Sequence, residues 1–245
     1  MTKYEFMRWF TLPIMPVLLV TAQKDIVRLV KRTKQNNNKF SILDVGGRKS
    51  PYTVNVPAEI TLLDVPQENN VQEKLNLGFT SELLDKVKNV RSNINNIIIE
   101  DMTKSTLSDA SFDAVVCVEV IEHVEEDDIF IKNVSKVINE NGWAYFTTPN
   151  GDYIKNVPPN FNPDHKRHYT RQQLQELLER HFDKVSVKYA VKTGKHRVWG
   201  LKSFKIKKPW RLVKSIFGNI VNRFESKSIE ETEHGTAHLI AIAYK

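Results

Sequence analysis

The stretch that decides the fold runs from Ile42 to Tyr52 and reads "ILDVGGRKSPY". An apolar run ends at Asp44 and two adjacent glycines follow, as in a cofactor-binding turn after a first parallel strand. A dinucleotide needs the spacing G-x-G-x-x-G, because its pyrophosphate lies against bare backbone at a helix N-terminus. Arg48 and Pro51 stand where the later glycines would be. The turn therefore argues against a dinucleotide site.

Apolar, strand-like runs alternate with helical patterns along the chain. Strands are expected at 40–45, 59–65, 95–100, 112–118, 143–148, 185–191 and 236–244, and helices at 22–34, 126–139 and 171–181. Thr170 is a suitable N-cap for the last of these helices. Pro57 and several β-branched residues disfavour a long helix between the first two strands. Such alternation predicts an α/β fold with a parallel sheet covered on both faces.

Ligands of such sheets bind outside the carboxyl ends of the strands. The polar residues expected at those ends are Asp44, Asp64, Asp101, Glu119 and Asn150. Asp64 closes the second strand, where a carboxylate can accept hydrogen bonds from ribose hydroxyls. S-adenosylmethionine contains a ribose but no phosphate, so it suits this acid and a turn with few glycines. Asp101, with Met102, would lie near its adenine amino group.

Several motifs follow one another in a set order. They are "LDVGG", "LLDV", "SFDAVVCVEVIEHV", "NENGWAYFTTPN" and "DHKRHYT". In this order, residues 40–190 resemble class I S-adenosylmethionine-dependent methyltransferases, in the branch with ubiquinone-type and glycan O-methyltransferases. The resemblance implies a Rossmann-like, seven-stranded, mostly parallel sheet with an antiparallel last strand. It also implies cofactor contacts by Asp44, Gly46 and Gly47 at the methionine end, Asp64 at the ribose, Asp101 and Met102 at the adenine, and Glu119 at the sulfonium.

Methyl transfer to a hydroxyl requires alignment of the acceptor, exclusion of water and a group that takes the proton. Histidine suits the last task because its pKa lies near neutrality. His123 follows the fourth strand, and His165 and His168 lie in the loop after the fifth. The expected catalytic residues are therefore His123, His165 and Glu119. The expected reaction is O-methylation of a small molecule or glycan, with a lipid-linked acceptor included.

Two alternatives stay open. Glu119, Glu122, His123 and His165 could hold Mg²⁺ or Mn²⁺. This set resembles the metal site of small-RNA 3′-terminal 2′-O-methyltransferases, which would imply metal-assisted methylation of RNA. Because E-x-x-E-H also occurs in metal-free relatives, no metal ligand is assigned. The expected cofactor is S-adenosylmethionine, and the product formed from it is S-adenosylhomocysteine. Arg48, in place of a further glycine, leaves open a catalytically degenerate binding protein of the same fold.

The net charge of +7 is concentrated in one segment. Residues 184–227 hold thirteen Lys or Arg and one acid, and apolar residues from Trp210 to Phe224 recur at helical spacing. This pattern predicts a basic amphipathic helix. It could pack on the core or on a second subunit, lie on an anionic membrane through residues 195–227, or hold an anionic acceptor. The aromatic residues fit the apolar stripe, so a stacking surface for nucleic acid is not indicated.

The expected organisation is an N-terminal helical extension at 1–38 and a methyltransferase domain at 39–245, with the basic insertion at about 194–234. Residues 10–20 are apolar but too short, and too interrupted by proline, to span a bilayer. Cys117 is the only cysteine, which excludes an intramolecular disulfide. No signal peptide is expected, so the predicted location of the protein is the cytoplasm. This prediction includes a peripheral position on the inner face of a membrane. The sequence does not indicate an oligomeric state.

Overall fold

The structure is a computed structural model, and it describes residues 1–33, 39–47, 50–65, 87, 90–158, 161–201 and 209–245. Arg48 and Lys49 of the opening motif lie outside the described residues, as do residues 34–38, where the N-terminal extension was expected to end. The division into extension and domain therefore stays a prediction.

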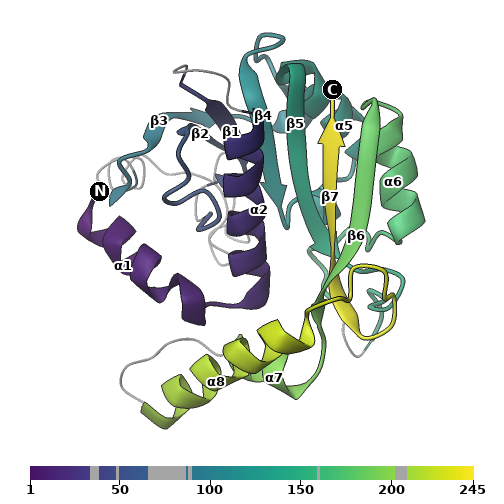
Figure 1. Ribbon diagram of the computed structural model, residues 1–245. Coiled ribbons are helices and arrows are strands. Elements are labelled where there is room, and N and C mark those ends of the chain that lie inside the picture. The colour runs from purple at the N-terminus through teal and green to yellow at the C-terminus, as the bar shows by residue number, and fades with distance from the viewer. Residues whose placement is uncertain (34–38, 48–49, 66–86, 88–89, 159–160, 202–208) are drawn as a thin grey trace.

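Seven strands form a single sheet (Figure 1). They are β1 (Ser41–Val45), β2 (Glu59–Asp64), β3 (Ile94–Ile99), β4 (Phe112–Val118), β5 (Ile138–Pro149), β6 (Lys184–Lys192) and β7 (Thr236–Tyr244). Their order is β3-β2-β1-β4-β5-β7-β6. The pairs among the first five strands are parallel, and β7 runs antiparallel to both β5 and β6. The predicted Rossmann-like sheet with an antiparallel last strand is confirmed.

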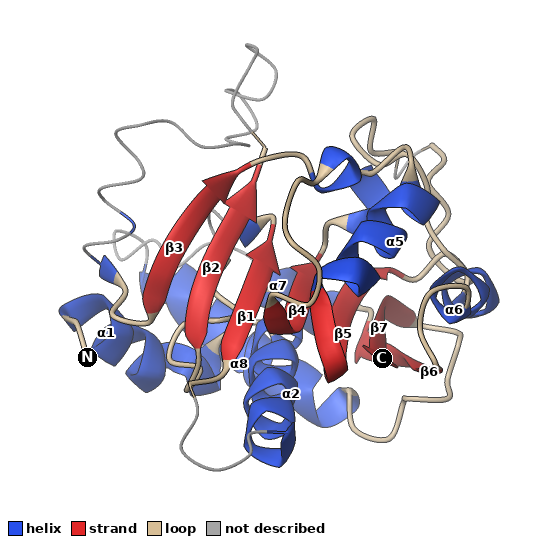
Figure 2. Ribbon diagram, turned by 90° about the horizontal axis from the view of Figure 1, so that it is seen from above, coloured by secondary structure: helices blue, strands red, loops and turns tan. Residues whose placement is uncertain are grey.

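Helices cover both faces of the sheet (Figure 2). They are α1 (Lys3–Thr11), α2 (Val17–Thr33), α5 (Asp127–Val137), α6 (Arg171–Glu179), α7 (Lys195–Gly200) and α8 (Pro209–Glu225), with short 3₁₀ turns η1 (Leu12–Ile14), η3 (Met102–Lys104) and η4 (Ile121–His123). Phe130 of α5 and Leu174 of α6 belong to one buried cluster, and Ile26 of α2 belongs to the other. Two cores on opposite faces explain why the strands are apolar on both sides.

The helix boundaries differ from the prediction by up to five residues, and two of the differences have a local reason. The helix expected at 22–34 begins at Val17, because the carbonyl of Pro16 already accepts the Val20 N–H at 3.1 Å. The helix expected to end at 139 ends at Val137, because β5 begins at Ile138. Within residues 50–58 the connection from β1 to β2 consists of turns, and the predicted lack of a long helix holds over that described part.

The helices were also compared with the length of a bilayer. Among the described residues, no single helix is both long and apolar enough to cross a membrane. Lys3–Ile14 and Val17–Thr33 meet the criterion only as a pair, and that pair is bent by 116°.

Candidate active site

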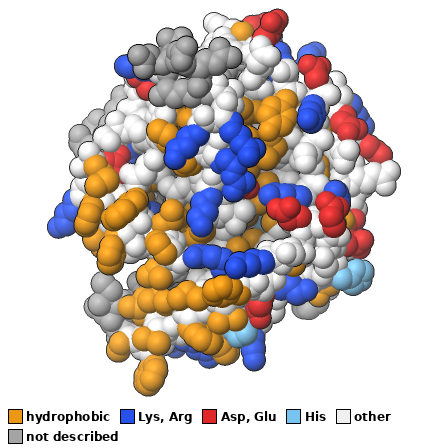
Figure 3. All heavy atoms as spheres, viewed as in Figure 1, with side chains coloured by type: hydrophobic (Ala, Val, Ile, Leu, Met, Phe, Trp, Pro, Cys, Tyr) orange, Lys and Arg blue, Asp and Glu red, His pale blue; other side chains and the backbone are white. Residues whose placement is uncertain are grey.

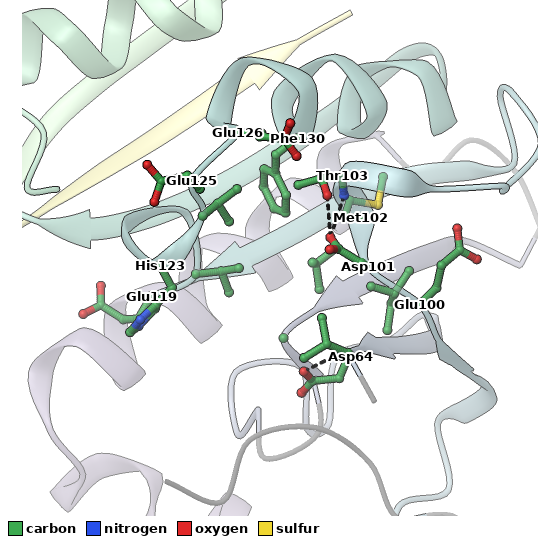
Figure 4. A pocket seen from close by; sticks show the side chains of 16 residues that line it. Asp64, Glu100, Asp101, Met102, Thr103, Glu119, His123, Glu125, Glu126 and Phe130 are labelled. Atoms are coloured by element: carbon green, nitrogen blue, oxygen red, sulfur yellow. Dashed lines mark hydrogen bonds between the residues drawn. The ribbon is translucent and has the colours of Figure 1, made fainter. Parts of the chain in front are cut away.

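A first cavity of about 380 Å³ lies at the carboxyl ends of β1, β2, β3 and β4 (Figure 4). Parallel strands end at the same edge of a sheet, so residues far apart in the sequence meet there. The residues that the sequence predicted for a cofactor and that line this cavity are Gly46, Asp64, Asp101, Met102 and Glu119, together with His123. The strand-end rule therefore brings most of the predicted cofactor residues into one space.

Gly46 forms the turn at the end of β1. Its φ is +70°, and a Cβ atom there would lie 2.7 Å from Cγ2 of Val120. Its N–H donates to the Leu63 carbonyl at 2.8 Å, which joins this turn to the end of β2. Both the backbone conformation and the close approach of Val120 require glycine. The turn thus leaves bare backbone at the cavity wall, as a bound ligand needs.

Two carboxylates stand at the ends of neighbouring strands. Oδ1 of Asp64 accepts a hydrogen bond from the Val65 N–H at 2.9 Å. Oδ1 of Asp101 accepts from both the N–H and the hydroxyl of Thr103, each at 2.9 Å, and so caps the η3 turn. Figure 4 shows the two side chains at the same wall of the cavity. Backbone contacts of this kind fix the carboxylates in place before a ligand arrives.

The described lining of the first cavity is acidic and apolar. It includes Asp64, Glu100, Asp101, Glu119, Glu125 and Glu126, and among its described residues there is no Lys or Arg. Such a wall repels phosphate and attracts a cation. Apolar side chains, including Met102 and Phe130, supply the surface on which a purine ring can pack. The residues present therefore fit S-adenosylmethionine, a phosphate-free nucleoside with a positive sulfonium.

Asp44 and Gly47, predicted at the methionine end, are not among the residues that line this cavity. The Asp44 side chain is buried and accepts a hydrogen bond from the hydroxyl of Thr53. Arg91 donates to the same hydroxyl at 2.8 Å. Burial raises the pKa of Asp44, against the opposing effects of Thr53 and Arg91. In this structure Asp44 holds the β1–β2 connection, and Gly47 packs over its carboxylate with a Cβ position 3.2 Å from Asp44 Cγ.

Glu119 stands directly after β4 in a left-handed conformation, with φ +56°. Its N–H donates to the Thr147 carbonyl, and the Thr147 hydroxyl donates to its Oε1 at 2.7 Å. Nδ1 of His238 lies 3.2 Å from the same oxygen. Burial alone would raise the pKa of Glu119, but its interactions with His238 and Thr147 hold the pKa below the ordinary value. Glu119 is thus held as a carboxylate by two neighbouring strands.

A relay of three side chains leads from Glu119 to the basic insertion. Nη2 of Arg197, on α7, lies 3.1 Å from Nε2 of His238. A guanidinium can only donate hydrogen bonds, so Nε2 of His238 must be the acceptor. Its Nδ1 then carries the proton and donates to Glu119. His238 thus bridges Glu119 and Arg197, and these two charged neighbours set its tautomer.

A second cavity of about 400 Å³ lies on the other side of Glu119. Its lining combines apolar and polar residues. The apolar ones include residues 16–19, Val191 and Leu201, and the polar ones are Glu119, Arg197, Asn219, Asn222 and His238. Glu119 is the only residue of the described lining that the two cavities share. A ligand in the second cavity would therefore meet a ligand in the first at this carboxylate.

The predicted histidines form a separate cluster near Glu122. Nδ1 of His123 lies 3.0 Å from the carbonyl oxygen of Asp164, so it must carry a proton. Nδ1 of His168 likewise lies 2.6 Å from the Ile154 carbonyl, and its Nε2 lies 2.7 Å from Nδ1 of His165. His168 therefore accepts from His165. When both rings are neutral, Nε2 of His123 and of His165 carries no proton.

These nitrogens face a buried acid. Ligand atoms of Glu122, His123 and His165 all lie within 4.8 Å of one another. Oε2 of Glu122 is buried and has no hydrogen-bond partner among the described residues. Burial and the nearby Glu119 raise the pKa of Glu122 well above its usual range. Two neutral imidazoles and one carboxylate could hold a divalent cation, and Glu119, the fourth residue of the alternative left open by the sequence, is not in this group.

The sequence analysis missed His238 and Arg197. His238 is a polar residue in the apolar run "TAHLIAIAY", and that exception was the available signal. Arg197 carried no such signal, because it is one of thirteen basic residues in its segment. Only the antiparallel pairing of β7 with β5 and β6 brings His238 beside Glu119.

Comparison with known proteins finds a matching family model and several relatives. Residues 43–146 match the family model described as a methyltransferase domain. The ubiquinone biosynthesis O-methyltransferase of Rickettsia akari is 27% identical over 168 residues, which cover 62% of this chain and 62% of that protein. The chain thus spans less than two thirds of the length of this curated relative.

Solved structures share the fold at low identity. A SAM-dependent methyltransferase from Archaeoglobus fulgidus has a TM-score of 0.55 and 15% identity, covering 91% of this chain and 94% of that one. The [4+2]-cyclase SpnF has a TM-score of 0.55 and 17% identity, covering 90% of this chain and 80% of its own. Because a cyclase shares the fold, the fold alone does not fix the reaction. Residues 43–146 nevertheless match a methyltransferase-domain model, within a fold shared with solved SAM-dependent methyltransferases.

Proposed function

We propose that this protein transfers a methyl group from S-adenosylmethionine to a hydroxyl of a small-molecule acceptor. The observation that supports this most is the pair of cavities that meet at Glu119. The name of the curated relatives, ubiquinone biosynthesis O-methyltransferase, favours oxygen as the methylated atom. A glycan or a lipid-linked hydroxyl falls within the same proposal.

The first cavity would hold the donor, which supplies an activated methyl group on a sulfonium. Asp64 would accept hydrogen bonds from the ribose, and Asp101 with Met102 would contact the adenine. The Gly46 turn would adjoin the methionine portion. Glu119, which lines both cavities, would attract the positively charged sulfonium of the donor. These roles match the positions of the side chains along the cavity wall.

The second cavity would hold the acceptor, and His238 would be its base. The bound donor would supply a methyl group to the acceptor oxygen and would keep the electron pair of the carbon–sulfur bond. The acceptor hydroxyl would replace Arg197 as the hydrogen-bond partner of Nε2 of His238, and its proton would pass to that nitrogen. The resulting imidazolium would be stabilised by Glu119 at Nδ1, as a carboxylate supports a histidine base in other enzymes. It then releases its proton to water.

His123 and His165, the bases predicted from the sequence, are less well placed for this task. His123 lines the first cavity and not the second, and neither described lining includes His165. A hydroxyl in the second cavity has His238 in its wall. This difference in position favours His238 over the other two.

Calorimetry with S-adenosylhomocysteine, with NAD as the matched control ligand, tests the donor site. We expect S-adenosylhomocysteine to bind and NAD to give no heat, because the described wall holds no phosphate partner. Failure of S-adenosylhomocysteine to bind would overturn the proposal. Binding without transfer of a radiolabelled methyl group to any hydroxyl acceptor would favour the catalytically degenerate alternative.

The histidine cluster favours a second candidate function, metal-assisted methylation of vicinal hydroxyls such as those at an RNA 3′ end. Glu122, His123 and His165 offer one buried carboxylate oxygen and two unprotonated nitrogens. Their opposite nitrogens are fixed by hydrogen bonds, as is usual for metal-binding histidines. Calorimetry of the EDTA-treated protein with Mn²⁺, beside a His165→Asn variant, tests it. Equal heats for both proteins, and turnover unchanged by EDTA, would remove this candidate.

A further inference from the structure

Helices α1 and α8 carry large apolar side chains that the rest of the described chain leaves uncovered. Trp9, Phe10, Trp210, Val213, Phe217 and Phe224 are each between 53% and 83% exposed. We call these six residues the α1–α8 patch. Figure 3 shows hydrophobic side chains gathered over both helices on one face of the molecule. Large apolar side chains gathered on a protein surface in this way mark contact with a partner or a membrane.

The patch is surrounded by positive charge. Helices α1, α7 and α8 together contain seven Lys or Arg and two acids. One acid, Glu5, is buried and accepts hydrogen bonds from Ser92, and the other, Glu225, lies 2.8 Å from Nδ1 of His196. Glu5 is therefore enclosed, whereas Glu225 is an exposed carboxylate that pairs with His196. Basic side chains lie beside the patch in Figure 3, and most of the acids on that face lie away from it.

The two helices are fixed to the body of the protein. Glu5 closes a capping box on α1 and also binds the Ser92 N–H, which ties α1 to the segment before β3. The Asn219 side chain of α8 donates to the Ile14 carbonyl at 2.9 Å, which ties α8 to η1. The two helices that carry the patch are thus fixed to the rest of the protein, and the aromatic side chains of the patch are exposed.

From these exposed apolar side chains and the basic residues beside them, we propose that the α1–α8 patch docks on an anionic lipid bilayer. Aromatic and aliphatic side chains on one face of a basic helix insert at the boundary of headgroups and acyl chains. Lys and Arg beside them contact anionic headgroups. A second copy of this chain fits less well, because a symmetric interface would place the basic rims of the two copies against each other.

The docked orientation has a consequence for the acceptor, and this step rests on the proposed function. Helix α8, which carries most of the patch, also lines the second cavity through Asn219 and Asn222. The neighbouring segments line it through residues 16–19, before and at the start of α2, and through Arg197 of α7. A docked protein would hold this cavity next to the bilayer. The acceptor class that fits is a membrane-partitioned molecule with an apolar body and one hydroxyl, which would lie at the Glu119 end.

Co-sedimentation with phosphatidylglycerol-containing vesicles, beside pure phosphatidylcholine vesicles, tests the docking. We expect binding to the anionic vesicles at low salt and weaker binding at high salt. Trp9→Ser with Trp210→Ser should reduce binding at least about tenfold, because two buried aromatic side chains are lost. Arg211→Gln with Lys214→Gln should reduce it by about fivefold per charge.

Matched controls separate the patch from general surface effects. Phe161→Ser removes an aromatic side chain that is 57% exposed outside the patch, and Lys184→Gln removes an exposed charge on β6. Neither should change vesicle binding. Thermal unfolding of each variant checks the fold, and S-adenosylhomocysteine binding checks the proposed function separately, since docking does not require it.

Two results would overturn the docking proposal. One is the absence of wild-type binding to anionic vesicles at low salt. The other is a dimer in analytical ultracentrifugation that the Trp9 and Trp210 substitutions dissociate while vesicle binding stays unchanged. That second result would assign the patch to a second copy of the chain.

Discussion

The two cavities beside Glu119 differ in where their walls come from. The first is built from the carboxyl ends of β1 to β4, which any parallel sheet of this order brings together. The second is built from the N-terminal segment, the basic insertion and the last strand. Their charges differ as well, since the described lining of the first is acidic and that of the second adds His238 and Arg197.

This difference separates what the fold supplies from what this chain adds. The strand-end edge places carboxylates for a nucleoside cofactor, and its position follows from sheet topology. The acceptor side depends on segments outside the shared sheet, so it can change without disturbing the donor side. If this division is right, substitutions in one cavity should leave the ligand of the other unaffected.

The largest expected effect comes from His238→Asn. Loss of a general base should lower kcat by about 100-fold or more. S-adenosylhomocysteine affinity should stay unchanged, because His238 does not line the first cavity. Transfer of a radiolabelled methyl group and calorimetry measure the two quantities. His234→Asn, a nearby exposed histidine, is the matched control. A fall in S-adenosylhomocysteine affinity as large as the fall in kcat would show that a substitution in the second cavity also affects the first.

Asp64→Asn should have the opposite profile. The charged acceptor of the ribose hydrogen bonds is lost, so affinity for S-adenosylhomocysteine should fall by roughly ten- to a hundredfold. Glu100→Gln, a carboxylate at the same edge that accepts hydrogen bonds from Thr106, serves as the control and should change affinity little. Calorimetry checks both. An Asp64 variant with wild-type affinity would contradict the donor assignment.

Gly46→Ala should damage the first cavity through the backbone. The new methyl group meets Val120 and the residue must keep φ near +70°, so we expect a loss of about 1–3 kcal/mol in the free energy of unfolding. Cofactor affinity should fall too. Gly194→Ala also places alanine at positive φ, but near no other atom, and should leave cofactor affinity intact. Denaturant unfolding and calorimetry would detect a departure from either expectation.

The smallest effect concerns His165 in EDTA-treated protein. Burial, His123 and His168 lower the pKa of His165 from 6.5 to about 4. Between these values the unfolded chain binds a proton that the folded chain does not, so stability should fall as the pH is lowered through that window. His165→Gln should show a shallower fall. Denaturant midpoints at several pH values measure this, and a steeper fall in the variant would contradict the assigned environment.

The same division explains what could be predicted from sequence. Strand periodicity located the seven strands, and the strand-end rule placed Asp64 and Asp101 at one edge. His238 could not be placed, because its neighbours depend on the antiparallel pairing of β7 with β5. Arg197 depends in addition on an insertion whose path no local pattern specifies. Asp44 differs from His238 and Arg197, because a role was predicted for it from its motif. The prediction was a cofactor contact, whereas in the structure its carboxylate accepts a hydrogen bond from Thr53.

A crystal structure with S-adenosylhomocysteine tests the central claim most directly. The account predicts the ribose within hydrogen-bond distance of the Asp64 carboxylate, the sulfur atom beside Glu119, and the second cavity left open on the far side of that residue. A ligand bound in the second cavity, or a ribose that does not contact Asp64, would contradict it.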